Sequence, residues 1–91
     1  MKKIYIVEGT TGEYEDREEW SVVAFKTKAK AKKHVKKAND WLLEKGFHRS
    51  QEQGPDRYSQ IGKNLENPYD PRMYYDYTGV EYNFYALDLE E

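Results

Sequence analysis

The chain contains no cysteine, only three prolines and two histidines, and no long apolar run. Without cysteine, a disulfide framework, a thiolate zinc site and a thiol nucleophile are all excluded, and a reducing cytoplasm is the expected location. No stretch approaches the roughly eighteen apolar residues that a membrane span needs, so no membrane partner is expected. The two histidines show no metal-ligand spacing, and we expect neither a metal nor a cofactor.

The size of the chain indicates one domain over residues 1–91. Its mean hydropathy of −1.13 and its hydrophobic content of 37% lean toward disorder. The aromatic content of 15% and the net charge of only −2 argue for a folded domain instead.

Two segments near the start have the composition of β-strands. Residues 3–7 are mostly β-branched or aromatic, and Gly9 and Gly12 then mark a turn or a bulge. Residues 20–25 are again dominated by strand formers, after a polar, acid-rich loop. The sequence therefore predicts a long-looped antiparallel pair of strands.

A helix is predicted over residues 28–45. Thr27 is a suitable N-cap, Val35, Ala38 and Leu42 form one apolar stripe, and Gly46 supplies the expected C-terminal stop. After it, prolines and glycines interrupt every periodicity over residues 47–79, which we interpret as an irregular Tyr/Pro-rich segment with a short strand or turn around residues 58–61.

The last strand is predicted over residues 80–89. Val80 and Tyr82 have one parity and Leu87 and Leu89 the other, which suggests a bulge near Tyr85. The order ββαβ predicts an α+β fold, a small antiparallel three-stranded sheet in the order 2-1-3 with the helix on one face. We expect the other face to present tyrosine, threonine and charged residues and to be partly wet.

Charges are segregated along the chain. The acidic group is Glu8, Glu13, Glu15, Asp16, Glu18 and Glu19. The basic group is Lys26, Lys28, Lys30, Lys32, Lys33, Lys36 and Lys37. An ordinary solvated helix face has the same appearance, but the asymmetry also suits an acidic loop offered to a basic protein surface, or a basic helix offered to nucleic acid.

Seven of the nine tyrosines lie from residue 58 onward. Tyrosine is enriched in protein-binding surfaces because it gives a large contact area and a polar tip at low entropy cost. The alternative is structural, in which Tyr69, Tyr75 and Tyr82 attach the irregular segment to the sheet.

Catalysis finds little support in the sequence. His34 lies among lysines, where a solvated helix residue is the usual interpretation, and His48 is a lone histidine in a polar segment. The segment from Gly9 to Gly12 lacks the spacing and the lysine of a phosphate loop. Asp16 with Glu18 or Glu19 imitates a carboxylate pair, yet such residues in an exposed hairpin loop normally do no acid–base work. We therefore predict that the chain is not an enzyme.

Two groups of short strings are distinctive. The first contains Tyr5-Ile6-Val7, Gly9-Thr10-Thr11-Gly12-Glu13-Tyr14, Asp16-Arg17 and Glu19-Trp20, and the second contains Asn67-Pro68-Tyr69-Asp70-Pro71, Met73 and Asp76-Tyr77-Thr78-Gly79. Together they resemble small bacteriophage and prophage proteins. The resemblance covers both ends of the chain and leaves out the lysine-rich helix and residues 47–66. It implies the cytoplasm of a host cell and an inhibitor that occupies a host protein's surface, in the style of anti-CRISPR and other counter-defence proteins.

The leading expectation is a protein-binding inhibitor or adaptor. Its contact residues are predicted to be Glu13, Tyr14, Glu15, Asp16, Glu18, Glu19, Tyr69, Tyr74, Tyr75 and Tyr77. The alternative is a nucleic-acid-binding module that uses Lys30, Lys33, Lys36 and Lys37. A third option is a nucleotide or small-molecule binder with a pocket between the last strand and the tyrosine-rich segment. The oligomeric state is left open.

Overall fold

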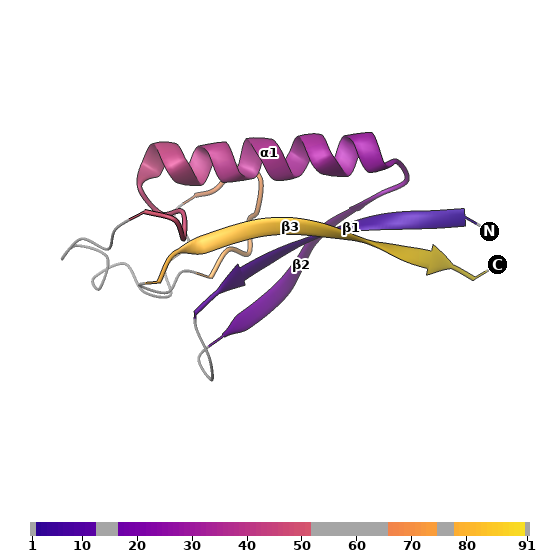
Figure 1. Ribbon diagram of the computed structural model, residues 1–91, viewed down its shortest axis with the longest axis horizontal. Coiled ribbons are helices and arrows are strands. Elements are labelled where there is room, and N and C mark those ends of the chain that lie inside the picture. The colour runs from indigo at the N-terminus through magenta and orange to yellow at the C-terminus, as the bar shows by residue number, and fades with distance from the viewer. Residues whose placement is uncertain (1, 13–16, 52–65, 75–77, 91) are drawn as a thin grey trace.

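The computed structural model describes residues 2–12, 17–51, 66–74 and 78–90. Its elements are β1 (Lys2–Thr11), β2 (Glu18–Phe25), α1 (Lys28–Lys45) and β3 (Val80–Leu89). The three strands form an antiparallel sheet in the order β2-β1-β3, and α1 lies across one of its faces (Figure 1). The α+β fold, the ββαβ order and the strand order predicted from the sequence are confirmed.

The helix begins and ends where its capping residues predict. Thr27 has extended backbone geometry, and its side-chain oxygen accepts a hydrogen bond from the Lys30 amide. At the other end Gly46 has a φ of 82°, and its N–H reaches the carbonyl groups of Leu42 and Leu43. The apolar stripe faces the sheet, with Ala38 and Leu42 fully buried.

The hydrophobic core lies between α1 and the sheet, toward the end where β3 begins. Ala38 and Leu42 from the helix pack with Val80 and Tyr82 from β3 and with Met73 from the loop before it. Aromatic residues cover the margins of this cluster, namely Trp20, Trp41, Phe47 and Tyr69.

Strand β1 is longer than the sequence predicts. It continues through Gly9 to Thr11, and the positive φ of 85° falls only at Gly12. A Cβ atom built on Gly9 would lie 2.6 Å from ring carbons of Trp20, so this glycine leaves room for the indole above the strand. Gly9 therefore serves side-chain packing within the strand and marks no turn, whereas Gly12 follows the last residue of β1.

The predicted bulge near Tyr85 is also wrong. Strands β1 and β3 pair without interruption from Lys2 opposite Leu89 to Thr11 opposite Val80. The register shift occurs in the other pairing, between Val7 and Glu8 of β1 against β2. Because β3 has no bulge, its leucines stay on the face opposite the helix, and Leu87 and Leu89 are 48% and 42% exposed.

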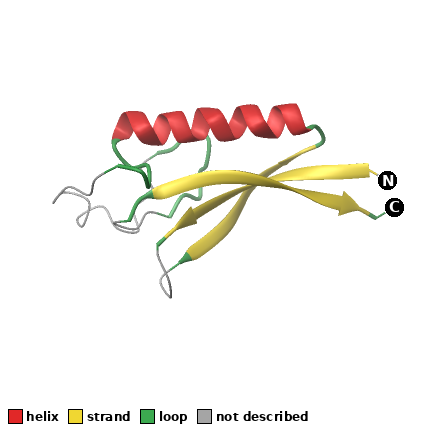
Figure 2. Cartoon of the chain, viewed as in Figure 1, coloured by secondary structure: helices red, strands yellow, loops and turns green. Residues whose placement is uncertain are grey.

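The described parts of the irregular segment are held against the start of β3. The Val80 N–H donates to the Phe47 carbonyl at 2.9 Å, and the Arg49 N–H donates to the Val80 carbonyl at 3.0 Å. Figure 2 shows these loops at the end of the molecule where α1 ends. The short strand or turn predicted around residues 58–61 lies outside the described residues.

Candidate functional site

Asn67 and Asp70 of the second distinctive string form a buried polar network with two aromatic side chains. The Asp70 carboxylate is fully buried, and its Oδ2 accepts hydrogen bonds from Trp20 Nε1 at 2.7 Å and from the Tyr82 hydroxyl at 2.8 Å. Asn67 in turn donates to the Tyr82 hydroxyl at 2.9 Å. Burial, followed by the neighbouring charge of Asp70, raises the pKa of Tyr82 far above its usual range. This network attaches the loop to the sheet.

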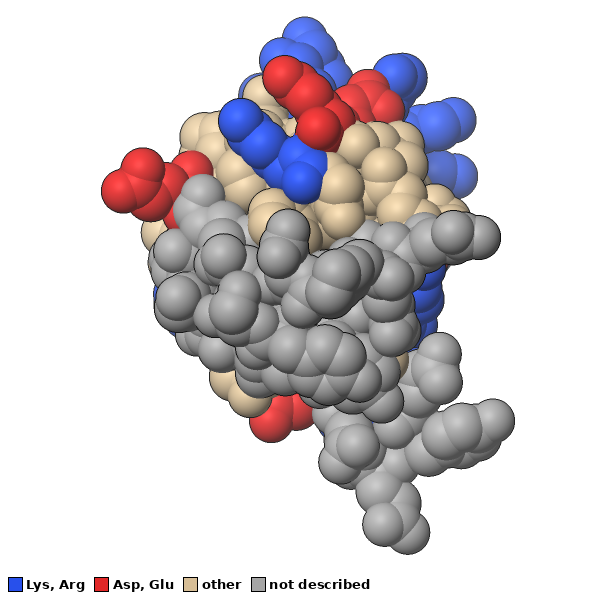
Figure 3. Space-filling view, turned by 90° about the vertical axis from the view of Figure 1, so that its left-hand side faces the viewer, with Lys and Arg blue, Asp and Glu red and all other residues tan. Residues whose placement is uncertain are grey.

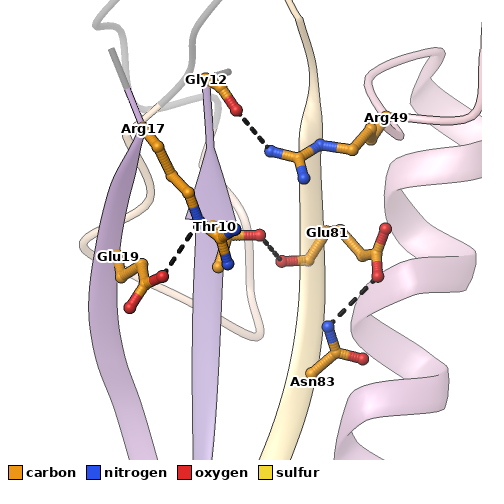
Figure 4. Close-up of polar contacts among 7 residues, drawn as sticks. All are labelled: Thr10, Gly12, Arg17, Glu19, Arg49, Glu81 and Asn83. Carbon is orange, nitrogen blue, oxygen red and sulfur yellow. Dashed lines mark hydrogen bonds and ion pairs between the residues drawn. The ribbon is translucent and has the colours of Figure 1, made fainter. Parts of the chain in front are cut away.

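The two distinctive strings meet in space. The Thr11 hydroxyl donates to the Gly79 carbonyl at 2.8 Å, and the Gly12 N–H donates to Thr78 Oγ1 at 2.9 Å. Arg49 donates from Nη2 to the Gly12 carbonyl at 2.7 Å (Figure 4). Residues 66 positions apart in sequence are thus tied into one corner of the fold. In the described residues, both strings hold the fold together.

The face of the sheet opposite α1, here called the open face, has an acidic end. Side chains of one parity along β1 and β3 share this face with their partners on β2, and Glu8, Glu19 and Glu81 are among them. Figure 4 shows Glu19 and Glu81 on either side of Thr10. Arg17 Nε pairs with Glu19 Oε1 at 2.9 Å, and Asn83 donates to Glu81 Oε1 at 3.1 Å. In the described part of this face, Arg17 is thus the arginine that pairs with a glutamate, and Glu8 and Glu81 lie nearby.

Glu8 shows that negative charge is crowded at this end. It lies opposite Ser21 of β2 and Asn83 of β3, one step along the face from Glu19. Partial burial raises the pKa of Glu8, and the charge and hydrogen bonding of Glu19 raise it further, while Arg17 opposes them. Two carboxylates that repel each other would gain from an added cation, such as a lysine or arginine side chain.

The other end of the open face is apolar. Ile6 of β1 lies between Ala24 of β2 and Tyr85 of β3, and Ile4 lies opposite Leu87. Tyr85, Leu87 and Leu89 are each more than 40% exposed. The expectation of a polar open face therefore holds only for the half that contains the glutamates. Sequence reasoning assigned no role to the open-face residues Glu81, Tyr85, Leu87 and Leu89. The assumed bulge hid the fact that Tyr85, Leu87 and Leu89 share one face.

The structure describes four of the predicted contact residues, and three of them are exposed. Glu18 and Glu19 are exposed at the start of β2, and Tyr74 is 38% exposed. Tyr69 is half-buried and packs against the core cluster. The other predicted contacts lie outside the described residues, namely Glu13, Tyr14, Glu15, Asp16, Tyr75 and Tyr77.

The predicted basic residues lie together along α1. Lys30, Lys33, Lys36 and Lys37 are all exposed. Among the described helix residues, Lys36 Nζ forms an ion pair with Asp40 at 2.8 Å. Figure 3 shows lysine or arginine side chains beside acidic ones along the top of the molecule. The surface of α1 is thus of mixed charge around Asp40, in its second half, and more purely basic toward its start.

His34 differs from its interpretation as a solvated helix residue. It is half-buried, and its ring lies 5.5 Å from that of Phe25 and 5.8 Å from that of Tyr69. Its Nε2 lies 2.9 Å from the Tyr69 carbonyl oxygen, at hydrogen-bond distance. The physical reason is that this side of α1 packs against Phe25 of β2 and Tyr69 of the loop. His34 is therefore a packing residue.

His48 and the described acidic residues form no evident reaction centre. His48 Nδ1 lies 2.8 Å from the Ser50 hydroxyl, two residues away. Within the described ranges, no three histidine or acidic side chains come together in a way that could hold a metal ion. In the same ranges, no helix is both long and apolar enough to pass through a bilayer.

Comparison of the chain with protein-family models, with curated proteins and with solved structures finds no match.

Proposed function

We propose that this chain is a protein-binding module that works through the open face of its sheet. The observation that supports this most is the exposure of Tyr85, Leu87 and Leu89, at 43%, 48% and 42%, on one continuous sheet surface. Contiguous exposed apolar side chains with a polar border are typical of protein interaction sites. A leucine or tyrosine that is only half covered still has much apolar surface to bury against a partner.

The charges of the open face define the partner's chemistry. Glu8, Glu19 and Glu81 border the apolar end, and the raised pKa of Glu8 reports both its partial burial and its proximity to Glu19. A partner that places lysine or arginine beside an apolar patch would relieve this repulsion and cover the leucines at the same time. The acidic residues Glu13, Glu15 and Asp16 follow Gly12 directly in sequence, and we include them in the proposed contact.

The proposed biological setting rests on the sequence resemblance to small bacteriophage proteins. We propose that the chain acts within a host cell and inhibits a host protein by occupying its surface, as counter-defence proteins do. This role needs no catalytic residue.

Affinity capture from a bacterial lysate with three variants tests the proposal. Leu87→Lys alters the apolar end, Glu19→Lys alters the acidic end, and Lys33→Glu is the control on the exposed side of the helix. We expect a specific protein to be recovered by the original chain and by the Lys33→Glu variant, and to be lost with the other two. Mass spectrometry identifies it, and amide exchange with the purified partner should then protect the open face. Capture that survives both open-face variants contradicts the proposal.

One observation favours a second candidate, a nucleic-acid-binding module. Lys30, Lys33 and Lys37 line a hollow of about 250 Å³ together with His34 and Phe25. Lysines beside an aromatic ring suit a phosphate backbone and a stacked base. The affinity of the chain for nucleic acid should then fall steeply with added salt and with Lys33→Glu, whereas Glu19→Lys should raise this affinity. The same two variants thus give opposite results for the two functions.

A further inference from the structure

The two edges of the sheet are protected unequally. Along β2 the register shift interrupts the strand, and the Ser21 carbonyl accepts a hydrogen bond from Arg72 at 2.9 Å. Along the first part of β3, Phe47 and Arg49 bond to the backbone of Val80. Asn39 then bonds both backbone groups of Tyr82, at 3.0 Å to its carbonyl and 2.9 Å from its N–H. These contacts keep further strands away.

The second part of β3 has no such cover in the described structure. The backbone N–H and C=O of Tyr82 point away from β1, since they bond to Asn39. In an antiparallel strand these groups alternate in direction, so every second residue after Tyr82 also points its N–H and C=O outward. These residues are Phe84, Ala86 and Asp88, and no described residue bonds to their outward N–H and C=O groups. Residues 84–88 also contain none of the lysine, proline or bulge that usually protects an exposed edge.

We propose that this edge pairs with the same edge of a second copy of the chain. The antiparallel pairing of residues 84–88 about a two-fold axis at Ala86 is self-complementary, since Phe84 of each copy then lies opposite Asp88 of the other. All the outward backbone groups of these residues become hydrogen-bonded. Pairing stops at Tyr82, where Asn39 already occupies the edge.

The side chains fit this register on both faces. On the open face, Tyr85 of each copy lies opposite Leu87 of the other, an aromatic–aliphatic pair of the kind that stabilises antiparallel strands. On the helix side, Lys32 and Lys36 share with Asn39 the flank of α1 that overhangs the edge of β3. Asp88 of the second copy arrives beside that flank, so a carboxylate meets lysines.

The dimer would be modest in strength and would enlarge the open face. An edge of five residues buries less than about 1,200 Å² in total, the range of weak and transient complexes. We expect the dissociation constant of the dimer to lie in the micromolar range. The two sheets would join into one sheet whose apolar ends meet at the axis. This inference goes beyond the proposed function, because it concerns the chain alone.

Sedimentation velocity of the whole chain at about 100 µM tests the dimer, a concentration at which a micromolar complex is mostly associated. Ala86→Pro removes an outward N–H that β1 does not use, so the fold should survive while the dimer is lost. Circular dichroism checks the fold.

The chain has no cysteine, so Ala86→Cys introduces a single thiol. Across a narrow antiparallel pair its Cα atoms would lie about 5.5 Å apart, within disulfide range. Ala24→Cys, exposed on β2, is the matched control.

The expected results are a dimer for the original chain, a monomer for Ala86→Pro, and faster disulfide formation for Ala86→Cys than for Ala24→Cys. A monomeric original chain, a dimer that persists with proline, or equal rates for the two cysteine variants would each overturn the proposal. If the proline variant does not fold, the cysteine comparison decides. Ala86 has the parity of the helix side, so loss of the dimer leaves partner capture by the open face to be tested separately.

Discussion

Replacing Tyr82 by phenylalanine removes one oxygen from the centre of the buried network and leaves the ring in place. That oxygen donates to Asp70 at 2.8 Å and accepts from Asn67 at 2.9 Å. Both partners are almost completely buried, so neither gains a hydrogen bond to bulk water in return. A hydrogen bond to a charged group is worth about 1.5–3 kcal/mol, and an unsatisfied buried group costs about 1–3 kcal/mol. We expect Tyr82→Phe to lower the free energy of unfolding by about 2–3 kcal/mol.

The matched control lies on the same strand. Tyr85 is 43% exposed, and no described residue bonds to its hydroxyl, so Tyr85→Phe should change stability by less than about 0.5 kcal/mol. Urea titration followed by tryptophan fluorescence measures both variants. Equal, small losses for the two variants would refute the structural role assigned to the network.

The difference in stability between the original chain and Tyr82→Phe should depend on pH. The pKa of Tyr82 is raised in the folded state, while in the unfolded chain the phenol ionises near pH 10. A raised folded pKa means that the stabilisation is fully present below about pH 10 and is lost as the pH rises above it. The stability advantage of the original chain over Tyr82→Phe should therefore shrink in alkaline solution. An advantage that is constant up to pH 11, about one unit past the phenol pKa, would contradict this.

Three further predictions concern glycine positions and the acidic end. Gly79 has a φ of 89°, and an added Cβ would lie 2.9 Å from the backbone of Arg49, whereas Gly46 has a φ of 82° and open space around it. Gly46→Ala should cost about 1 kcal/mol in thermal or urea unfolding and Gly79→Ala clearly more, so equal costs would contradict the close approach. Gly9→Ala should displace the Trp20 indole, cost about 1–3 kcal/mol and change the tryptophan emission; an unchanged spectrum would argue against the contact. In Glu19→Gln the midpoint of Glu8 titration, followed by carboxyl NMR, should move down toward its ordinary value, and an unmoved midpoint would rule out the coupling between them.

Local sequence features were sufficient where the chain's own neighbours decide the structure. Thr27 and Gly46 satisfy the unpaired backbone groups at the two ends of α1, and the apolar spacing between them selects its buried side. The order of two strands, a helix and a third strand then allows few arrangements, and the observed β2-β1-β3 order is the one predicted. These features depend on hydrogen bonds and periodicity within a few residues.

Contacts between segments that are far apart in sequence could not be predicted from local sequence features. Nothing near Gly9 in sequence indicates that Trp20 covers it, and nothing near Asp70 indicates that Trp20 and Tyr82 supply its hydrogen bonds. The composition of Asn67-Pro68-Tyr69-Asp70 suggests a loop in either case. Whether that loop is buried as a structural attachment or displayed as a contact surface depends on partners 12 and 50 residues away.

The sequence by itself determined the helix, the identity of the strands and the topology, because those follow from local hydrogen bonding and from the hydrophobic period. The tertiary structure alone decided which side of each strand is exposed. Sequence reasoning assumed a bulge at Tyr85, which would turn Leu87 and Leu89 toward the core, whereas the uninterrupted pairing of β3 with β1 keeps them on the open face. The candidate interface therefore depends on strand register, which is fixed by packing across the whole sheet.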